Sequence, residues 1–313
     1  MNAVLLDTDS LGSGLDFSEL ERVLPGIVCY GMTEKNDVME RVEHADVVLT
    51  NKVVIDAETM ASAKHLKLIC VLATGTNNVD LETARARGIE VRNVTNYGTA
   101  SVAQHTLMMM LALATKLPSY QQDVRQGAWE ESPFFCLLGH PVTQLAGKTL
   151  VIVGSGTLGK HVARLAEAFE MNVHFSARPG STDDVRPSLM TLLPSADVVS
   201  LHCPLTTETE HLIDDAALKA MKPEAFLVNC ARGGVIDEKA ALSALREKRI
   251  AGLAIDVLPE EPPRKGHDVL QALRDEPALN LIVTPHSAWA SHEARQTIIE
   301  LTAKNVIEVF EER

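Results

Sequence analysis

A glycine-rich turn in the middle of the chain constrains the fold most. Residues 149–159 read Thr-Leu-Val-Ile-Val-Gly-Ser-Gly-Thr-Leu-Gly. The apolar run at 150–153 is typical of a buried parallel strand, and the glycines that follow are spaced G-x-G-x-x-G. Gly154 allows a sharp turn, Gly156 lets a pyrophosphate approach the backbone, and Gly159 lets a helix pack closely on the strand.

The residues after this turn predict a helix whose N-terminus faces the phosphates. Its apolar stripe is Leu158, Val162, Leu165 and Phe169. The first N–H groups of a helix and its dipole both favour an anion at that end. A tight strand-to-helix turn without a ligand is the alternative, because such turns are common. The strand before and the helix after favour the dinucleotide site.

Composition limits the partners that the chain can have. Its 313 residues suffice for two domains, and the net charge of −13 argues against nucleic acids and anionic membranes as partners. The apolar stretch 107–114 is too short to span a bilayer, and no signal peptide is recognisable. Five scattered cysteines without C-x-x-C spacing predict free thiols in the cytoplasm. Eleven histidines without metal-ligand spacing predict no metal site.

Strand and helix patterns alternate along both halves of the chain, which predicts an α/β protein with parallel sheets. The first series has strands near 3–6, 26–30, 46–50, 66–72 and 89–94. The second has strands near 149–153, 172–176, 197–201, 225–230, 251–255 and 281–284. Six strands in that order fit a doubly wound dinucleotide domain.

Two further segments are distinctive. A long apolar helix is predicted at 101–116, with a methionine-rich stripe that is more often core than a special surface. Residues 117–147 are expected to be irregular and contain Trp129, Phe134 and Phe135. An ordered loop of this length needs a reason, and we expect it to be the dimerisation arm of a homodimer.

Three reactive side chains follow strands of the second series. Arg232 lies beside a double glycine in NCARGGVIDE, Glu261 lies in DVLPEEPP, and His286 lies in TPHSAW. Ligands of open α/β sheets bind at the carboxyl ends of strands, so these three groups can converge.

With the glycine turn, these motifs make the chain similar to the D-2-hydroxyacid dehydrogenase family along nearly its whole length. The resemblance implies a doubly wound Rossmann cofactor domain at 99–287, inserted in a flavodoxin-like substrate domain of residues 1–98 and 288–313. TNK at 50–52, SVAQH, SPFFC at 132–136 and PHSAWAS look most like glycerate dehydrogenases, also called hydroxypyruvate reductases.

The resemblance implies a catalytic triad. Arg232 would bind the substrate carboxylate and polarise the carbonyl group. His286 would be the acid in reduction and the base in oxidation, and Glu261 would orient it and favour its protonated form. The alternatives are a surface salt bridge for Arg232, a structural cap for His286 and an ordinary loop carboxylate for Glu261. The adjacent Glu260 could be mistaken for Glu261 in this role.

The remaining site residues come from both predicted domains. Substrate contacts are expected, besides Arg232, from Lys52, Ala73, Thr74, Gly75 and Thr76; for Lys52 a solvated loop charge is an equal alternative. Cofactor contacts are expected from Ser101, Gly154, Ser155, Gly156, Thr157, Leu158, Gly159, Ser176, Arg178, His202, Cys203, Pro204, Thr209, Cys230, Ala231, Arg232, Asp256, His286 and Ala288.

The second strand of the cofactor domain lacks the acidic residue that usually binds the adenosine ribose. Its end reads Ser176-Ala177-Arg178, with no acid before Asp183. Arg178 could pair with a 2′-phosphate, so we expect NADP(H) to be favoured and NAD(H) to be possible. Alternatively, Arg178 stacks on adenine or lies in solvent.

These observations predict reversible reduction of a small 2-oxo acid, hydroxypyruvate or glyoxylate, to D-glycerate or glycolate. One alternative is another enzyme of the family, such as a D-lactate-type or phosphite dehydrogenase. The other is a non-catalytic, dinucleotide-sensing protein that resembles the corepressors with this fold. Turnover of hydroxypyruvate would separate the two classes.

Overall fold

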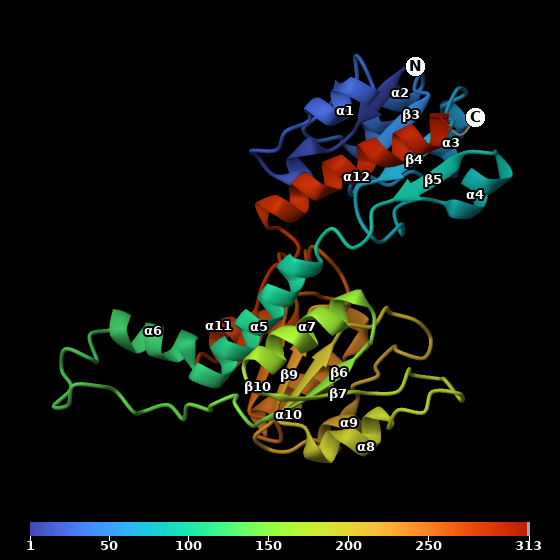
Figure 1. Ribbon diagram of the computed structural model, residues 1–313. Helices are drawn as coiled ribbons and strands as arrows, with labels where there is room; N and C mark the ends of the chain where they lie inside the picture. The colour runs from blue at the N-terminus through green and yellow to red at the C-terminus, as the bar shows by residue number, and fades with distance from the viewer. Residues whose placement is uncertain (312–313) are drawn as a thin grey trace. The chain divides into compact units, whose positions relative to one another are not determined.

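The structure, a computed structural model, describes residues 1–311 and divides into two compact units. Unit 1 comprises Met1–Gly98 and Ala290–Arg313, and unit 2 comprises Thr99–Trp289 (Figure 1). The last part of unit 1 begins at Ala290, two residues later than the predicted residue 288. The reason is that the loop containing Ala288 is hydrogen-bonded to unit 2.

Unit 1 is a parallel five-stranded sheet covered by helices. The strand order β2-β1-β3-β4-β5 is flavodoxin-like. The strands are β1 (Ala3–Leu5), β2 (Val28–Cys29), β3 (Val47–Thr50), β4 (Leu68–Val71) and β5 (Glu90–Asn93). The helices are α1 (Ser18–Val23), α2 (Val38–Val42), α3 (Ala57–Ser62), α4 (Leu81–Ala86) and α12 (His292–Glu311), with short 3-10 turns at Thr8–Leu11 and Lys35–Asp37. α12 returns from the end of the chain to pack on α1, β4 and β5 (Figure 1).

Unit 2 is a parallel six-stranded sheet in the order β11-β10-β9-β8-β6-β7. The strands are β6 (Thr149–Val153), β7 (Asn172–Phe175), β8 (Val198–Leu201), β9 (Phe226–Asn229), β10 (Gly252–Ile255) and β11 (Leu281–Val283). From β6 the chain adds β7 on one side and then crosses over to add β8 on the other side. The glycine turn after β6 therefore lies at the topological switch point, where such sheets bind ligands. The predicted α/β architecture of two parallel sheets is confirmed.

Helices cover both faces of the sheet in unit 2. The helices of this unit are α5 (Thr99–Thr115), α6 (Leu117–Arg125), α7 (Thr157–Ala168), α8 (Leu189–Leu192), α9 (Asp215–Ala220), α10 (Glu238–Arg246) and α11 (Asp268–Asp275), with 3-10 turns at Leu193–Ser195 and Gly233–Val235, and all of them except α6 lie against the sheet or its covering helices. Alternate residues of a strand point to opposite faces. Leu150 and Ile152 of β6 therefore join the core under α5 and α7, while Val151 and Val153 join the core under α9 and α10. This two-sided burial explains the continuous apolar run in the sequence.

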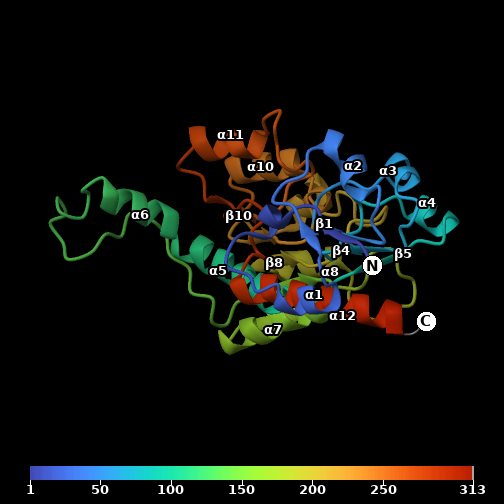
Figure 2. The same ribbon diagram turned by 90° about the horizontal axis from the view of Figure 1, so that it is seen from above.

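Two details of unit 2 differ from the sequence-based expectation. Residues 117–147 are not wholly irregular, because α6 begins directly after Lys116, whose φ of 55° ends α5, and Pro118 fits the first turn of the new helix. Phe169 is 42% exposed at the end of α7, and the buried stripe of that helix is Gly159, Val162, Ala163 and Ala166. Figures 1 and 2 both show α6 and the loop after it projecting from the sheet of unit 2.

Among residues 1–311, no helix combines the length and the apolar character that crossing a membrane requires. The same residues contain no group of three His, Cys, Asp or Glu side chains arranged to hold a metal ion.

Candidate active site

The glycine turn after β6 forms a cradle that fits a pyrophosphate. A Cβ on Gly154, whose φ is 106°, would lie 2.5 Å from the His202 carbonyl oxygen, and a Cβ on Gly159 would lie 1.9 Å from that of Gly154. A Cβ on Gly156 would meet nothing within 4 Å, so the space before it is open. Gly156 is also the N-cap of α7, and no side chain caps the first turn of that helix. Open space and uncapped amides are what an anion at a helix N-terminus requires.

The end of β7 carries an acid that the sequence did not lead us to expect. The loop after Arg178 folds back, and the Arg178 backbone N–H donates to Asp184 Oδ2 at 2.8 Å. Arg186 forms a bidentate pair with the same carboxylate and holds the pKa of Asp184 well below its usual range. Arg178 itself is exposed at the strand end.

The two serines of this region have other surroundings. Ser176 is buried, and its Oγ has no hydrogen-bond partner among residues 1–311. The Ser181 hydroxyl donates to Asp183 Oδ1 at 2.5 Å. Ser181 is thus already bonded within its own loop, whereas the Ser176 hydroxyl lies in the interior.

Parallel pairing brings the three reactive segments to one edge of the sheet. β9, β10 and β11 are neighbours, and Ile255 of β10 is in register with Asn229 and with Val283. All three strands end at the same edge. The residues that follow them include Arg232, Glu261 and His286, as the sequence predicted.

The Glu261 carboxylate accepts two hydrogen bonds. Its Oε2 lies 2.5 Å from His286 Nδ1, and its Oε1 accepts the Leu258 N–H at 2.7 Å. Nδ1 therefore carries a hydrogen, which leaves His286 Nε2 available to a substrate. His286 has a φ of 51°, and its N–H donates to the Asp256 carbonyl at 2.7 Å, so the backbone turns the imidazole toward Glu261.

Asp256 holds the turn on which His286 lies. Its buried carboxylate accepts hydrogen bonds from the Thr284 hydroxyl at 2.5 Å, the Ser287 N–H at 2.9 Å and the Ala288 N–H at 3.1 Å. His105 Nε2 of α5 lies 3.0 Å from Thr284 Oγ1, and burial lowers the pKa of His105 while Asp256 opposes this shift. Sequence reasoning identified Asp256 but missed Thr284 and His105.

Other bonds fix the segments on either side of this turn. The Ser101 hydroxyl donates to the Ala288 carbonyl at 2.7 Å, which ties α5 to the end of the turn. Asn229 Oδ1 accepts the Ala231 N–H, and Asn229 Nδ2 donates to the Arg232 carbonyl. Arg232 is itself exposed, and its guanidinium donates to the Ala231 carbonyl.

Gly233 brings the Arg232 segment against the loop that carries Glu261. A Cβ on Gly233 would lie 2.1 Å from the Leu258 carbonyl carbon and 2.2 Å from the Pro259 nitrogen. The two backbones therefore touch at a point where only a glycine fits.

Several predicted cofactor contacts turn their side chains inward. Burial raises the pKa of the Cys203 thiol to about 11 and that of the Cys230 thiol to about 12. The Thr209 hydroxyl donates to the Pro204 carbonyl at 2.7 Å. His202 Nε2 lies 2.8 Å from Ser200 Oγ, its Nδ1 is buried without a partner among residues 1–311, and burial lowers its pKa to about 4. The side chains of Cys203, Cys230 and Thr209 are thus buried in unit 2.

In unit 1, hydrogen bonds fix the two loops that contain the predicted substrate contacts. The buried carboxylate of Asp7 accepts the Asn51 N–H at 2.9 Å and the Lys52 N–H at 2.6 Å, and this fixes the loop after β3. The turn at 73–76 follows the neighbouring β4, and its Thr74 carbonyl accepts Asn93 Nδ2 at 2.7 Å. Sequence reasoning missed Asp7, although an acid so soon after a buried strand is a usable signal.

Comparison with known proteins decides the family. The sequence model described as "D-isomer specific 2-hydroxyacid dehydrogenase, NAD binding domain" matches residues 107–288. This chain belongs to the D-isomer-specific 2-hydroxyacid dehydrogenase family. It is 43% identical to a glycerate dehydrogenase of Methylorubrum extorquens over 86% of this chain and 84% of that protein. It is 41% identical to a putative 2-hydroxyacid dehydrogenase of Haemophilus influenzae over 90% of each chain.

Solved structures agree with this assignment. The crystal structure of a protein from Thermus thermophilus superposes with a TM-score of 0.85 at 35% identity, over 100% of this chain and 98% of that one. As a D-2-hydroxyacid dehydrogenase, the protein is an oxidoreductase that interconverts 2-oxo acids and D-2-hydroxy acids with a nicotinamide dinucleotide. The predicted family and enzyme class are confirmed.

The contact at Gly233 leads to a test of the site. In Gly233→Ala the new methyl group would push the Leu258–Pro259 backbone away and displace Glu261. We expect kcat/KM to fall roughly 10- to 100-fold, the scale of a misplacement of about 1 Å. Gly234→Ala is the control, because its Cβ would lie 3.1 Å from Leu205 Cδ2, the end of a flexible side chain. Equal activity of both variants in steady-state assays would disprove the argument.

Proposed function

We propose that this dehydrogenase reduces hydroxypyruvate or glyoxylate, reversibly, to D-glycerate or glycolate. The main support for the proposal is the Glu261–His286 pair at the strand ends of unit 2. Glu261 is bonded to Nδ1 of the imidazole, so Nε2 can form a hydrogen bond with a substrate oxygen. The relatives named glycerate dehydrogenase, hydroxypyruvate reductase and glyoxylate reductase support this choice of substrate.

Each residue has a defined task in the proposal. A bound nicotinamide cofactor supplies or accepts the hydride. His286 gives a proton from Nε2 to the carbonyl oxygen in reduction and takes it back in oxidation. Glu261 accepts the Nδ1 hydrogen and stabilises the charged imidazole. Arg232 binds the substrate carboxylate.

The substrate is tested with hydroxypyruvate, glyoxylate, pyruvate, phenylpyruvate and oxaloacetate, each with NADH and with NADPH. We expect the highest kcat/KM for hydroxypyruvate or glyoxylate. Much faster reduction of a bulky 2-oxo acid would overturn the proposed substrate but not the family.

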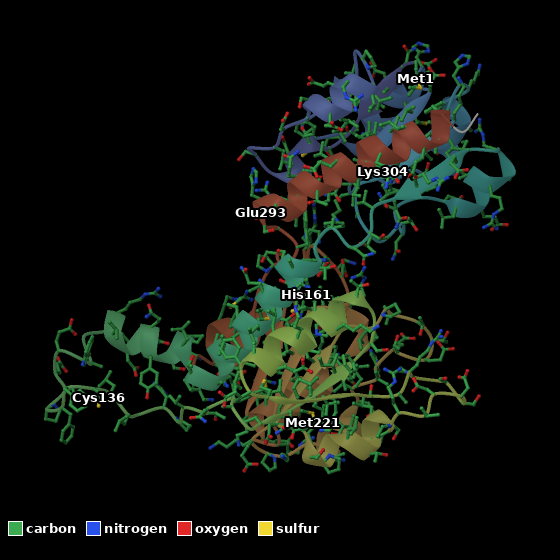
Figure 3. All side chains as sticks on the ribbon, in the orientation of Figure 1. Met1, Cys136, His161, Met221, Glu293 and Lys304 are labelled. Carbon is green, nitrogen blue, oxygen red and sulfur yellow. The ribbon has the colours of Figure 1, made fainter. Side chains whose placement is uncertain are left out.

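Loss of the proposed acid should be severe. We expect His286→Ala to reduce kcat roughly 10²- to 10⁴-fold, the usual contribution of general acid–base catalysis, with little change in the Kd of the cofactor. Steady-state kinetics and a cofactor titration measure the two quantities. The control is His161→Ala, at a histidine on α7 (Figure 3). Its imidazole contacts the Arg164 side chain. Near-normal turnover of His286→Ala would remove His286 from the mechanism.

We also propose that NADPH is preferred to NADH. Ala177 and the exposed Arg178 follow β7, and Asp184, which accepts the Arg178 backbone N–H, is already paired with Arg186. Asp183 and Glu208 also interact electrostatically with Arg178, and a 2′-phosphate would compete with them for its charge. A hydrogen bond to a charged group contributes about 1.5–3 kcal/mol, so Arg178→Ala should lower kcat/KM for NADPH by roughly 10- to 150-fold and leave NADH use nearly unchanged. Arg22→Ala in unit 1 is the control. Wild-type enzyme that prefers NADH tenfold would contradict this choice.

The projecting segment of unit 2 supports a homodimer. Trp129, Phe134, Phe135 and Leu138 are 52%, 73%, 91% and 86% exposed, and Figure 3 places Cys136 in the same loop, away from the sheet. Apolar exposure of this extent is typical of an interaction surface.

The five free cysteines support the predicted cytoplasmic location.

We expect a mass in solution of twice the 34.0 kDa of the chain at micromolar concentration, measured by light scattering. Phe134→Ser with Phe135→Ser should lower that mass, because it removes the apolar contact area. Val185→Ser, at a position that is 99% exposed in another loop, should not. A monomeric wild-type protein would exclude this assembly.

A further inference from the structure

The loop that follows β7 brings an acid back to the end of that strand. Asp184 lies six residues after Arg178 in the sequence, yet its Oδ2 accepts the Arg178 backbone N–H at 2.8 Å. At this strand end a dinucleotide domain usually carries the acid that binds the adenosine ribose. The acid that the sequence lacks at Ala177 is therefore supplied by the folding of the loop.

Arg186, a residue without a role in the sequence analysis or in the proposed mechanism, covers this carboxylate. Asp184 Oδ1 accepts the Arg186 backbone N–H at 3.1 Å and its Nε–H at 2.9 Å, and Oδ2 accepts its Nη2–H at 2.5 Å. With the bond from Arg178, four donors reach the two oxygens. A carboxylate offers about four acceptor sites, so little capacity remains for ribose hydroxyl groups.

The loop is also held by bonds that do not involve the Arg186 side chain. The Ala177 N–H donates to the Pro187 carbonyl at 2.8 Å, and the Ser181 N–H donates to the Arg178 carbonyl at 3.0 Å. The bond from the Arg178 N–H to Asp184 is independent of that side chain as well. Loss of the Arg186 guanidinium is therefore expected to leave Asp184 at the strand end and to uncover its charge.

We propose that Arg186 is a specificity-determining residue for the cofactor, because it masks the Asp184 carboxylate at the end of β7. An unmasked carboxylate there would repel a 2′-phosphate and would accept hydrogen bonds from the ribose hydroxyl groups of NAD(H). The two arginines thus have different tasks: Arg178 binds the phosphate, and Arg186 neutralises the acid that would oppose it. This inference deepens the proposed preference for NADPH and rests on it.

The Kd values of NADP⁺ and NAD⁺, measured by calorimetry without substrate, test the inference. Arg186→Gln removes the guanidinium charge and its bidentate contact with Asp184. We expect the ratio of the Kd of NADP⁺ to that of NAD⁺ to rise roughly 10-fold or more, the scale of one hydrogen bond to a charged group. Tighter binding of NAD⁺ should contribute to this rise. An unchanged ratio would overturn the inference.

Variants of the other partner distinguish masking from a structural role of the pair. Asp184→Asn breaks the same ion pair but removes the negative charge, so the ratio should stay constant or shift toward NADP⁺. If the pair only held the loop, Asp184→Asn and Arg186→Gln would weaken NADP⁺ binding alike, and that result would overturn the inference. The double variant has no acid to unmask, so its ratio should return toward that of wild type. A double variant with the ratio of Arg186→Gln would show that masking is not the cause.

Arg246→Gln is the matched control. Arg246 of α10 also pairs with a carboxylate through its guanidinium, with Nε 3.1 Å from each oxygen of Glu276, and its loss should leave the ratio unchanged. The wild-type protein separates this inference from the proposed cofactor choice. Tighter binding of NAD⁺ by wild type would overturn both. A wild type that prefers NADP⁺, with an unchanged ratio in Arg186→Gln, would overturn the role of Arg186 alone.

Discussion

The Asp256 carboxylate at the end of β10 accepts three hydrogen bonds from the segment that follows β11. These bonds continue the pairing of β10 with β11 beyond the last paired residues of the two strands. They hold Thr284, Ser287 and Ala288, and between them His286 takes the backbone conformation that directs its imidazole to Glu261. Without a charged acceptor at this point, the N–H groups of the turn would lose their partners in a buried place, which is costly.

Unit 1 uses the same device. Asp7 lies just beyond β1, and it accepts the N–H groups of Asn51 and Lys52 from the loop after the neighbouring β3. In both units a buried carboxylate accepts backbone N–H groups together with a side-chain hydroxyl. Such acceptors fix the direction of a loop without adding a flexible ion pair. The loops that carry the proposed site are therefore held by the sheets beneath them.

The sequence was informative wherever a function depends on local spacing. The glycine turn, the alternation of strands and helices, and the strand ends before Arg232 and His286 could all be read from neighbouring residues. The contacts that it did not reveal join residues of different loops and helices, or residues of one loop that folds back on itself. The return of Asp184 to Arg178, the bond from His105 to Thr284 and the pairing of Glu238 with His267 each depend on how loops fold back. Helix α6 was missed for a local reason, since one left-handed residue, Lys116, divides two helical segments.

The return of α12 to unit 1 limits the order in which the two units can fold during synthesis. β4 and β5 receive this covering helix from residues that follow the whole of Thr99–Trp289. During synthesis the inserted unit is complete before the last helix of the outer unit has been made. The face of β4 and β5 that α12 covers therefore lacks its helix until the rest of the chain has been made. The second unit to be translated is thus the first that can reach its native state.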